Sequence, residues 1–94
     1  MNINALRSRA PGSDSLRRYE TIAQLLTGTP YVESAVKWLA EMCDALNIPG
    51  LGKYGIETGH IADVITKAKN ASSMKANPVV LTDAELYEIV RRAL

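Results

Sequence analysis

Few residues in this chain of 94 have the types and spacing that catalysis or metal binding requires. His60 is the single histidine, and only Glu57 and Asp63 lie close to it as further oxygen ligands. A structural or catalytic metal site would need more histidine or cysteine ligands at a regular spacing. We therefore expect a surface histidine, with a carboxylate-rich site around His60 as the alternative, and we expect the isolated chain to bind no metal.

Two other features invite a chemical interpretation but are better explained by structure. Cys43 has no second cysteine to pair with, which fits a reducing compartment, and it lies on an apolar stripe, so we expect it to pack in the core. Gly50, Gly52 and Gly55 crowd one short stretch, yet they match neither phosphate-binding glycine pattern and follow a predicted helix rather than a strand. We expect that stretch to be a structural connection.

The charge balance excludes a strongly basic nucleic-acid-binding domain. The formal net charge is +1 and the pI is about 7.9, although Arg7, Arg9, Arg17 and Arg18 form a local basic cluster that we interpret as a solvated face. No apolar run is long enough to span a membrane, and the N-terminus lacks the pattern of a signal peptide. We expect a soluble, cytoplasmic protein with no nucleic-acid or membrane partner.

The elements that would position these residues are predicted to be helices, and the segment 31–46 is the central one. Its apolar positions recur at helical spacing, while Glu33, Lys37, Glu41 and Asp44 lie on the opposite arc. The predicted buried stripe consists of Val32, Ala35, Val36, Leu39, Met42, Cys43 and Leu46.

Similar stripes predict helices at about 15–27, 59–69 and 83–93. Local signals mark their ends: Gly28 stops the first helix, Thr58 caps the third, and Thr82 with Glu85 forms a capping box before the last. No segment alternates as a strand would. The sequence therefore predicts an all-α fold with four main helices in an antiparallel array.

The N-terminal stretch 1–13 lacks a sustained hydrophobic period and contains the turn signal Pro11-Gly12. We expect residues 1–13 to be a flexible tail or loop and residues 14–94 to be one helical domain.

The order of these segments and the sequences of the segments that connect them resemble those of one known family. The motif I-P-x-L-x-x-Y-G-I at Ile48–Ile56 and the motif N-P-x-x-L-T-x-x-E-L at Asn77–Leu86 carry most of the match. Together with LRRYETIAQLLTG at Leu16–Gly28, they make the chain similar, from about Asn2 to Leu94, to the C-terminal helical region of the iron-dependent alcohol dehydrogenases.

This resemblance implies a larger, two-domain parent enzyme that interconverts alcohols and aldehydes with NAD(P). In that family one aspartate and three histidines hold iron or another divalent metal, and a glycine-rich turn binds the cofactor. The matching segments would precede Met1, so the resemblance implies that this chain is a scaffold segment without catalytic residues, metal ligands or cofactor-binding residues. Its partners would be the missing dinucleotide-binding and metal-bearing regions.

The resemblance also implies a role for Ser73 and Met74, which match a loop near the substrate cleft of the family. A hydroxyl and a flexible thioether would suit the lining of an alcohol or aldehyde pocket. The alternative is that both residues simply end a helix.

Two other functions compete with the scaffold hypothesis. One is a free-standing helical module that binds another protein, and the other is a helix-turn-helix nucleic-acid binder, which the near-neutral charge argues against. If helix faces of the parent are left uncovered here, weak self-association should follow. Trp38, at the edge of the central stripe, would lie at that contact or would be ordinary packing within the chain.

Overall fold

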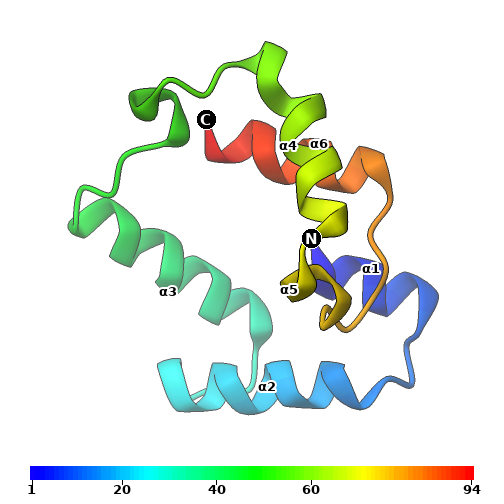
Figure 1. The fold of residues 1–94 in the computed structure, drawn as a ribbon. Helices are drawn as coiled ribbons and strands as arrows, with labels where there is room; N and C mark the ends of the chain where they lie inside the picture. Colours follow the sequence, from blue (N-terminus) through cyan, green and yellow to red (C-terminus); the bar gives the residue numbers. More distant parts are fainter. The chain divides into compact units, whose positions relative to one another are not determined.

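The structure, a computed structural model, describes all 94 residues, and every regular element in it is helical. The predicted all-α class is therefore confirmed. The elements in chain order are α1 (Asn2–Arg9), α2 (Asp14–Thr27), α3 (Val32–Ala45), the 3₁₀ turns η1 (Leu51–Tyr54) and η2 (Thr58–His60), α4 (Ile61–Asn70), α5 (Ser72–Lys75) and α6 (Asp83–Ala93), as Figure 1 shows. None of these helices has both the length and the apolar character that crossing a membrane requires.

The chain divides into two compact units, which are described separately. One comprises Ile3–Ile48, and the other comprises Met1–Asn2 with Pro49–Leu94. Helices α2, α3, α4 and α6 occupy the four segments in which the apolar period predicts helices, and α1, α5 and the two 3₁₀ turns come in addition.

Within the Ile3–Ile48 unit, α2 and α3 pack against each other across a four-residue connection whose start is fixed by Gly28. Gly28 has a φ of 78°, in the left-handed region that glycine adopts without steric cost, and its N–H donates to the carbonyl of Gln24 at 2.9 Å. Gly28 therefore ends α2 as the sequence predicts.

Helix α3 ends in a Schellman motif centred on Asn47. Asn47 has a φ of 52°, its N–H donates to Asp44 O at 3.0 Å, and the N–H of Ile48 donates to Cys43 O at 3.0 Å. Pro49 follows and keeps Ile48 out of helical geometry. Two of the carbonyls that a helix end leaves unpaired thus find backbone partners.

The expectation of a loop across residues 1–13 is wrong for residues 2–9, which form α1. Ala5 and Leu6 are buried, at 3% and 0% exposure, and the N–H of Ala10 continues the helical hydrogen bonding to Leu6 O at 2.8 Å. Burial of two adjacent side chains leaves no repeating stripe in the sequence, because one turn of helix suffices to place them. Tertiary packing here prevails over a weak local pattern.

The apolar stripe of α3 is only partly covered. Val32 and Ala35 in its first turn are buried, but the later members are exposed. The exposed set is Val36, Leu39, Met42, Cys43 and Leu46, and we call it the α3 apolar face. The expectation that Cys43 packs in the core is therefore wrong, because Cys43 is exposed and no other element of the Ile3–Ile48 unit buries it.

The Pro49–Leu94 unit is built around contacts between α4 and α6. Ile61 and Ile65 of α4 and Leu86 of α6 form a buried cluster, at 1%, 9% and 5% exposure. The partly buried side chains that pack on this cluster are Met74, Leu81, Val90 and Leu94. Here the predicted stripes of two helices cover each other, and burial of apolar area supplies the main stabilising term.

The glycine-rich stretch wraps closely around the last residue of the chain. The N–H of Gly52 donates to the main-chain oxygen of Leu94 at 3.3 Å. A Cβ at Gly50 would lie 2.8 Å from the carbonyl carbon of Leu94 and closer still to its oxygen, so only glycine fits there. The stretch is a structural connection, as its sequence indicates.

Local capping explains where α6 starts. The N–H of Thr82 donates to Glu85 Oε2 at 2.8 Å, and the N–H of Glu85 donates to Thr82 Oγ1 at 3.2 Å, which is the predicted capping box. The predicted cap at Thr58 is wrong: Glu57 and His60 make the reciprocal contacts around η2, and α4 begins only at Ile61. A 3₁₀ turn inserted before α4 moves the cap away from Thr58.

Candidate functional site

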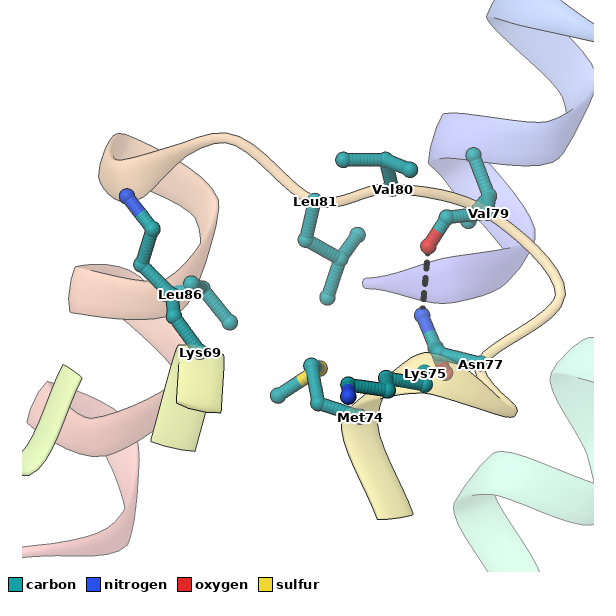
Figure 2. Close-up of a pocket in the computed structure, with 8 residues that line it drawn as sticks. All are labelled: Lys69, Met74, Lys75, Asn77, Val79, Val80, Leu81 and Leu86. Atoms are coloured by element: carbon teal, nitrogen blue, oxygen red, sulfur yellow. Dashed lines mark hydrogen bonds between the residues drawn. The ribbon is translucent and has the colours of Figure 1, made fainter. Parts of the chain in front are cut away.

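A concave site lies in the Pro49–Leu94 unit, where α5 and the loop after it face the ends of α4 and α6. It is a pocket of about 250 Å³ with one wall of apolar side chains and a rim of two lysines and one asparagine. Figure 2 shows its lining: Lys69, Met74, Lys75, Asn77, Val79, Val80, Leu81 and Leu86. A second hollow, of about 230 Å³, adjoins the same Met74, Asn77, Leu81 and Leu86 from the core side. These four side chains thus stand between two incompletely filled spaces.

Asn77 shapes the rim of the pocket. Its Nδ2 donates to Val79 O at 2.6 Å, the hydrogen bond drawn in Figure 2, and to Asn2 Oδ1 at 3.1 Å. Its Oδ1 accepts from Asn2 Nδ2 at 2.7 Å, so the two amides pair reciprocally. All three contacts hold the loop in place, and Asn77 is a structural residue of the pocket.

The two lysines at the rim differ in their partners. Lys69 Nζ donates to Asp83 Oδ1 at 2.6 Å, so that its charge is compensated. Lys75 makes no ion pair, and in Figure 2 its ammonium points toward the middle of the residues that line the pocket. The pocket therefore combines an apolar wall with one uncompensated positive charge.

The structure separates the two residues that the family resemblance suggests for a substrate cleft. Met74 is half-buried, packs on the Ile61–Ile65–Leu86 cluster and lines the pocket, whereas Ser73 is exposed and does not belong to the lining. Their role in a cleft stays a prediction. Lys75, Asn77 and Lys69 were not among the predicted site residues. The only sequence signal for Lys75 is its position next to Met74, and nothing in the sequence pairs Asn77 with Asn2.

His60 takes part in a local cap. The N–H of Glu57 donates to its Nδ1 at 3.0 Å, and the imidazole is exposed at the start of α4. No group of three or more histidine, cysteine, aspartate or glutamate side chains is placed to hold a metal ion. The residues present do not fit a metal centre of the kind that the resemblance implies for the parent.

Three arginines of the predicted basic cluster are matched with carboxylates. Arg7 pairs with Glu33, while Arg17 and Arg18 both pair with Asp14. The hydrogen bond from Arg7 lowers the pKa of Glu33 below its ordinary value, because it favours the ionised carboxylate. Arginines engaged in this way form a solvated, charge-balanced face, in line with the sequence-based interpretation.

The α3 apolar face is the second candidate, in the Ile3–Ile48 unit. Val36, Leu39 and Leu46 are 54%, 49% and 64% exposed, and they follow one another at helical spacing along the last turns of α3. Trp38, at the edge of the stripe, is half-buried. A contiguous row of this kind is uncommon on a free surface and is typical of a contact with another element or protein.

Comparison of the chain with protein-family models, with curated proteins and with solved structures found no match.

Proposed function

We propose that this chain is the C-terminal helical scaffold of an iron-dependent, NAD(P)-linked alcohol dehydrogenase. The α3 apolar face is the observation that carries the proposal beyond the resemblance of the motifs. A helical segment that normally packs against another part of an enzyme should leave an apolar face uncovered when it stands alone. The exposure of Leu39 and Leu46 supports the proposal.

The chain contributes structure in this proposal, and the chemistry comes from outside it. Iron and the nicotinamide cofactor would supply hydride transfer between alcohol and aldehyde, but His60 is engaged in the cap with Glu57 and no cluster of ligands surrounds it. The metal and the cofactor would both be held by the missing regions. Met74, and with it Ser73 of the same helix α5, would border the substrate cleft of the assembled enzyme.

The test is complementation of a truncated enzyme. A family member is cut before the region matching Asn2 and is co-expressed with this chain, and NAD(P)-linked alcohol oxidation and co-purification are measured. We expect activity to return only with the chain present. Leu46→Asp should abolish the rescue, because it places a carboxylate on the α3 apolar face, whereas Lys37→Asp, on the polar face of the same helix, should preserve it.

If the chain is folded but neither restores activity nor co-purifies with the truncated enzyme, the scaffold proposal is refuted. The alternative, a free-standing module for protein–protein interaction, is favoured by the same exposed face. It predicts that Leu46→Asp abolishes binding to a defined partner that is unrelated to dehydrogenases. Complementation and partner binding thus separate the two functions while using the same pair of variants.

A further inference from the structure

The size and the wall of the pocket beside α5 suit a short alkyl chain. Its volume is about 250 Å³, and Met74, Leu81 and Leu86 supply the apolar side chains of its wall, while Val79 and Val80 border it from the loop. An apolar protein cavity of about 150 Å³ already accepts a benzene molecule, so this pocket has room for a chain of about six carbon atoms. The flexible thioether of Met74 allows the wall to adapt to such a chain.

The charges at the rim determine which charge the polar end of the ligand should carry. Lys69 is compensated by Asp83 at 2.6 Å, which leaves the ammonium of Lys75 as the one cation without an ion-pair partner at the pocket. Asn77 uses its amide on Asn2 and Val79. The rim can therefore balance a single negative charge next to the apolar wall.

We propose that this pocket binds a short-chain monocarboxylate, with its alkyl chain against Met74, Leu81 and Leu86 and its carboxylate at Lys75. A phosphate dianion would require more than one uncompensated cation, and a neutral ligand would leave Lys75 unused. The proposal is independent of the dehydrogenase assignment, because it concerns binding by this chain alone.

Binding should also stabilise the unit that contains the pocket. Met74, Leu81 and Leu86 belong to or pack on the only buried apolar cluster of the Pro49–Leu94 unit. A ligand that fills the hollow beside them adds contacts that the folded chain has and the unfolded chain lacks. The melting temperature should therefore rise with ligand concentration.

The experiment titrates the full chain with hexanoate, followed by the NMR signals of the Met74 and Leu86 methyl groups and by thermal melting. We expect saturable shifts with a dissociation constant of about 1 mM, as befits a ligand of few atoms at a half-open site. Hexan-1-ol has the chain without the charge and should bind at least about tenfold more weakly, and acetate has the charge without the chain and should give no saturable shift.

Lys75→Gln is the decisive variant, since Lys75 is exposed and its replacement leaves the core intact. It should weaken hexanoate binding to the level of hexan-1-ol and leave hexan-1-ol binding unchanged. Lys53→Gln, an exposed lysine of η1 outside the pocket, is the matched control and should bind hexanoate as the natural chain does. The proposal is overturned if hexanoate gives no saturable shift, if hexan-1-ol binds as tightly, or if Lys75→Gln binds hexanoate undiminished.

Discussion

Helices α4 and α3 carry apolar stripes of the same period, and the chain treats them differently. Ile61 and Ile65 of α4 are at most 9% exposed, because Leu86 of α6 packs on them. Leu39 and Leu46 of α3 are 49% and 64% exposed, although their spacing is equally regular. The comparison teaches that a periodic pattern determines the helix and its apolar face, while coverage of that face depends on a second element that the pattern does not specify.

The largest expected effect is on the free energy of unfolding, when a buried leucine of α6 is truncated and compared with an exposed leucine of α3. Leu86→Ala removes a buried side chain from the cluster and should cost about 2–5 kcal/mol of unfolding free energy. Leu39→Ala removes an exposed one and should change it by at most about 0.5 kcal/mol. Urea unfolding followed by circular dichroism measures both. Equal costs for the two variants would show that the α3 apolar face is covered in solution.

A smaller effect should come from the glycine that abuts Leu94. Gly50→Ala forces a Cβ into the main chain of Leu94 and should destabilise the protein by about 1–3 kcal/mol. Gly12→Ala is the matched control, because no heavy atom lies within 4 Å of its Cβ position, and it should be close to neutral. Unfolding midpoints in urea compare them, and a neutral Gly50→Ala would contradict the close approach.

Removing the N-cap of α6 should destabilise the protein by a smaller amount. Thr82→Ala loses the oxygen that accepts from the N–H of Glu85, which is worth about 1 kcal/mol, and should lower the melting temperature by roughly 4–8 °C. Thr58→Ala, at the exposed threonine that caps no helix, should leave it unchanged. Thermal melting of the two variants side by side is the measurement, and an unaltered melting temperature for Thr82→Ala would argue against the capping box.

The exposed α3 apolar face should cause weak self-association of the chain. We expect sedimentation velocity over a hundredfold concentration range to show a concentration-dependent boundary, with a parallel change in Trp38 emission. Leu46→Asp should suppress both effects, and Lys37→Asp should not. A strictly monomeric boundary with constant emission would rule out association through α3.

The smallest expected effect is a loss of stability in acid, caused by protonation of Glu88 in α6. Hydrogen bonds from Arg91 and then Arg92 lower the pKa of Glu88 from 4.5 to about 2. The folded chain therefore binds this proton less tightly than the unfolded chain. The stabilisation is complete above about pH 4.5 and is lost as the pH falls toward 2. Since the side chains of Arg91 and Arg92 are largely exposed, salt should weaken the effect.

The control for this last effect is Glu88→Gln, which removes the titrating carboxyl. Urea midpoints of the natural chain and of Glu88→Gln should converge as the pH falls from 4.5 to 2 and differ by a constant amount above it. An NMR titration of Glu88 that gives an ordinary pKa would contradict the arginine contacts.

Features that depend on neighbours in sequence could be predicted, and features that depend on distant residues could not. The capping box of Thr82 and Glu85 and the left-handed ends at Gly28 and Asn47 each involve a few consecutive residues, so their chemistry is visible in the sequence. The exposure of Cys43 depends on whether another element covers α3, about which a local pattern carries no information.

The candidate site follows the same division. Met74 could be suggested from the motif around it, but the different roles of Lys69 and Lys75 depend on Asp83, which lies beyond the loop. The reciprocal pair of Asn77 and Asn2 joins residues from the two ends of the sequence, and no spacing rule predicts it. Such contacts become known only once the backbone has placed both partners.

The contact between the Gly50–Gly52 turn and Leu94 has a consequence for synthesis. It joins the first residues of the Pro49–Leu94 unit to the last, and contacts between sequence-distant residues require a long loop to close, at an entropic cost that local helix contacts avoid. A nascent chain can form α2 and α3 while it is still attached to the ribosome. The glycine turn, in contrast, stays without its partner until Leu94 has left the exit tunnel.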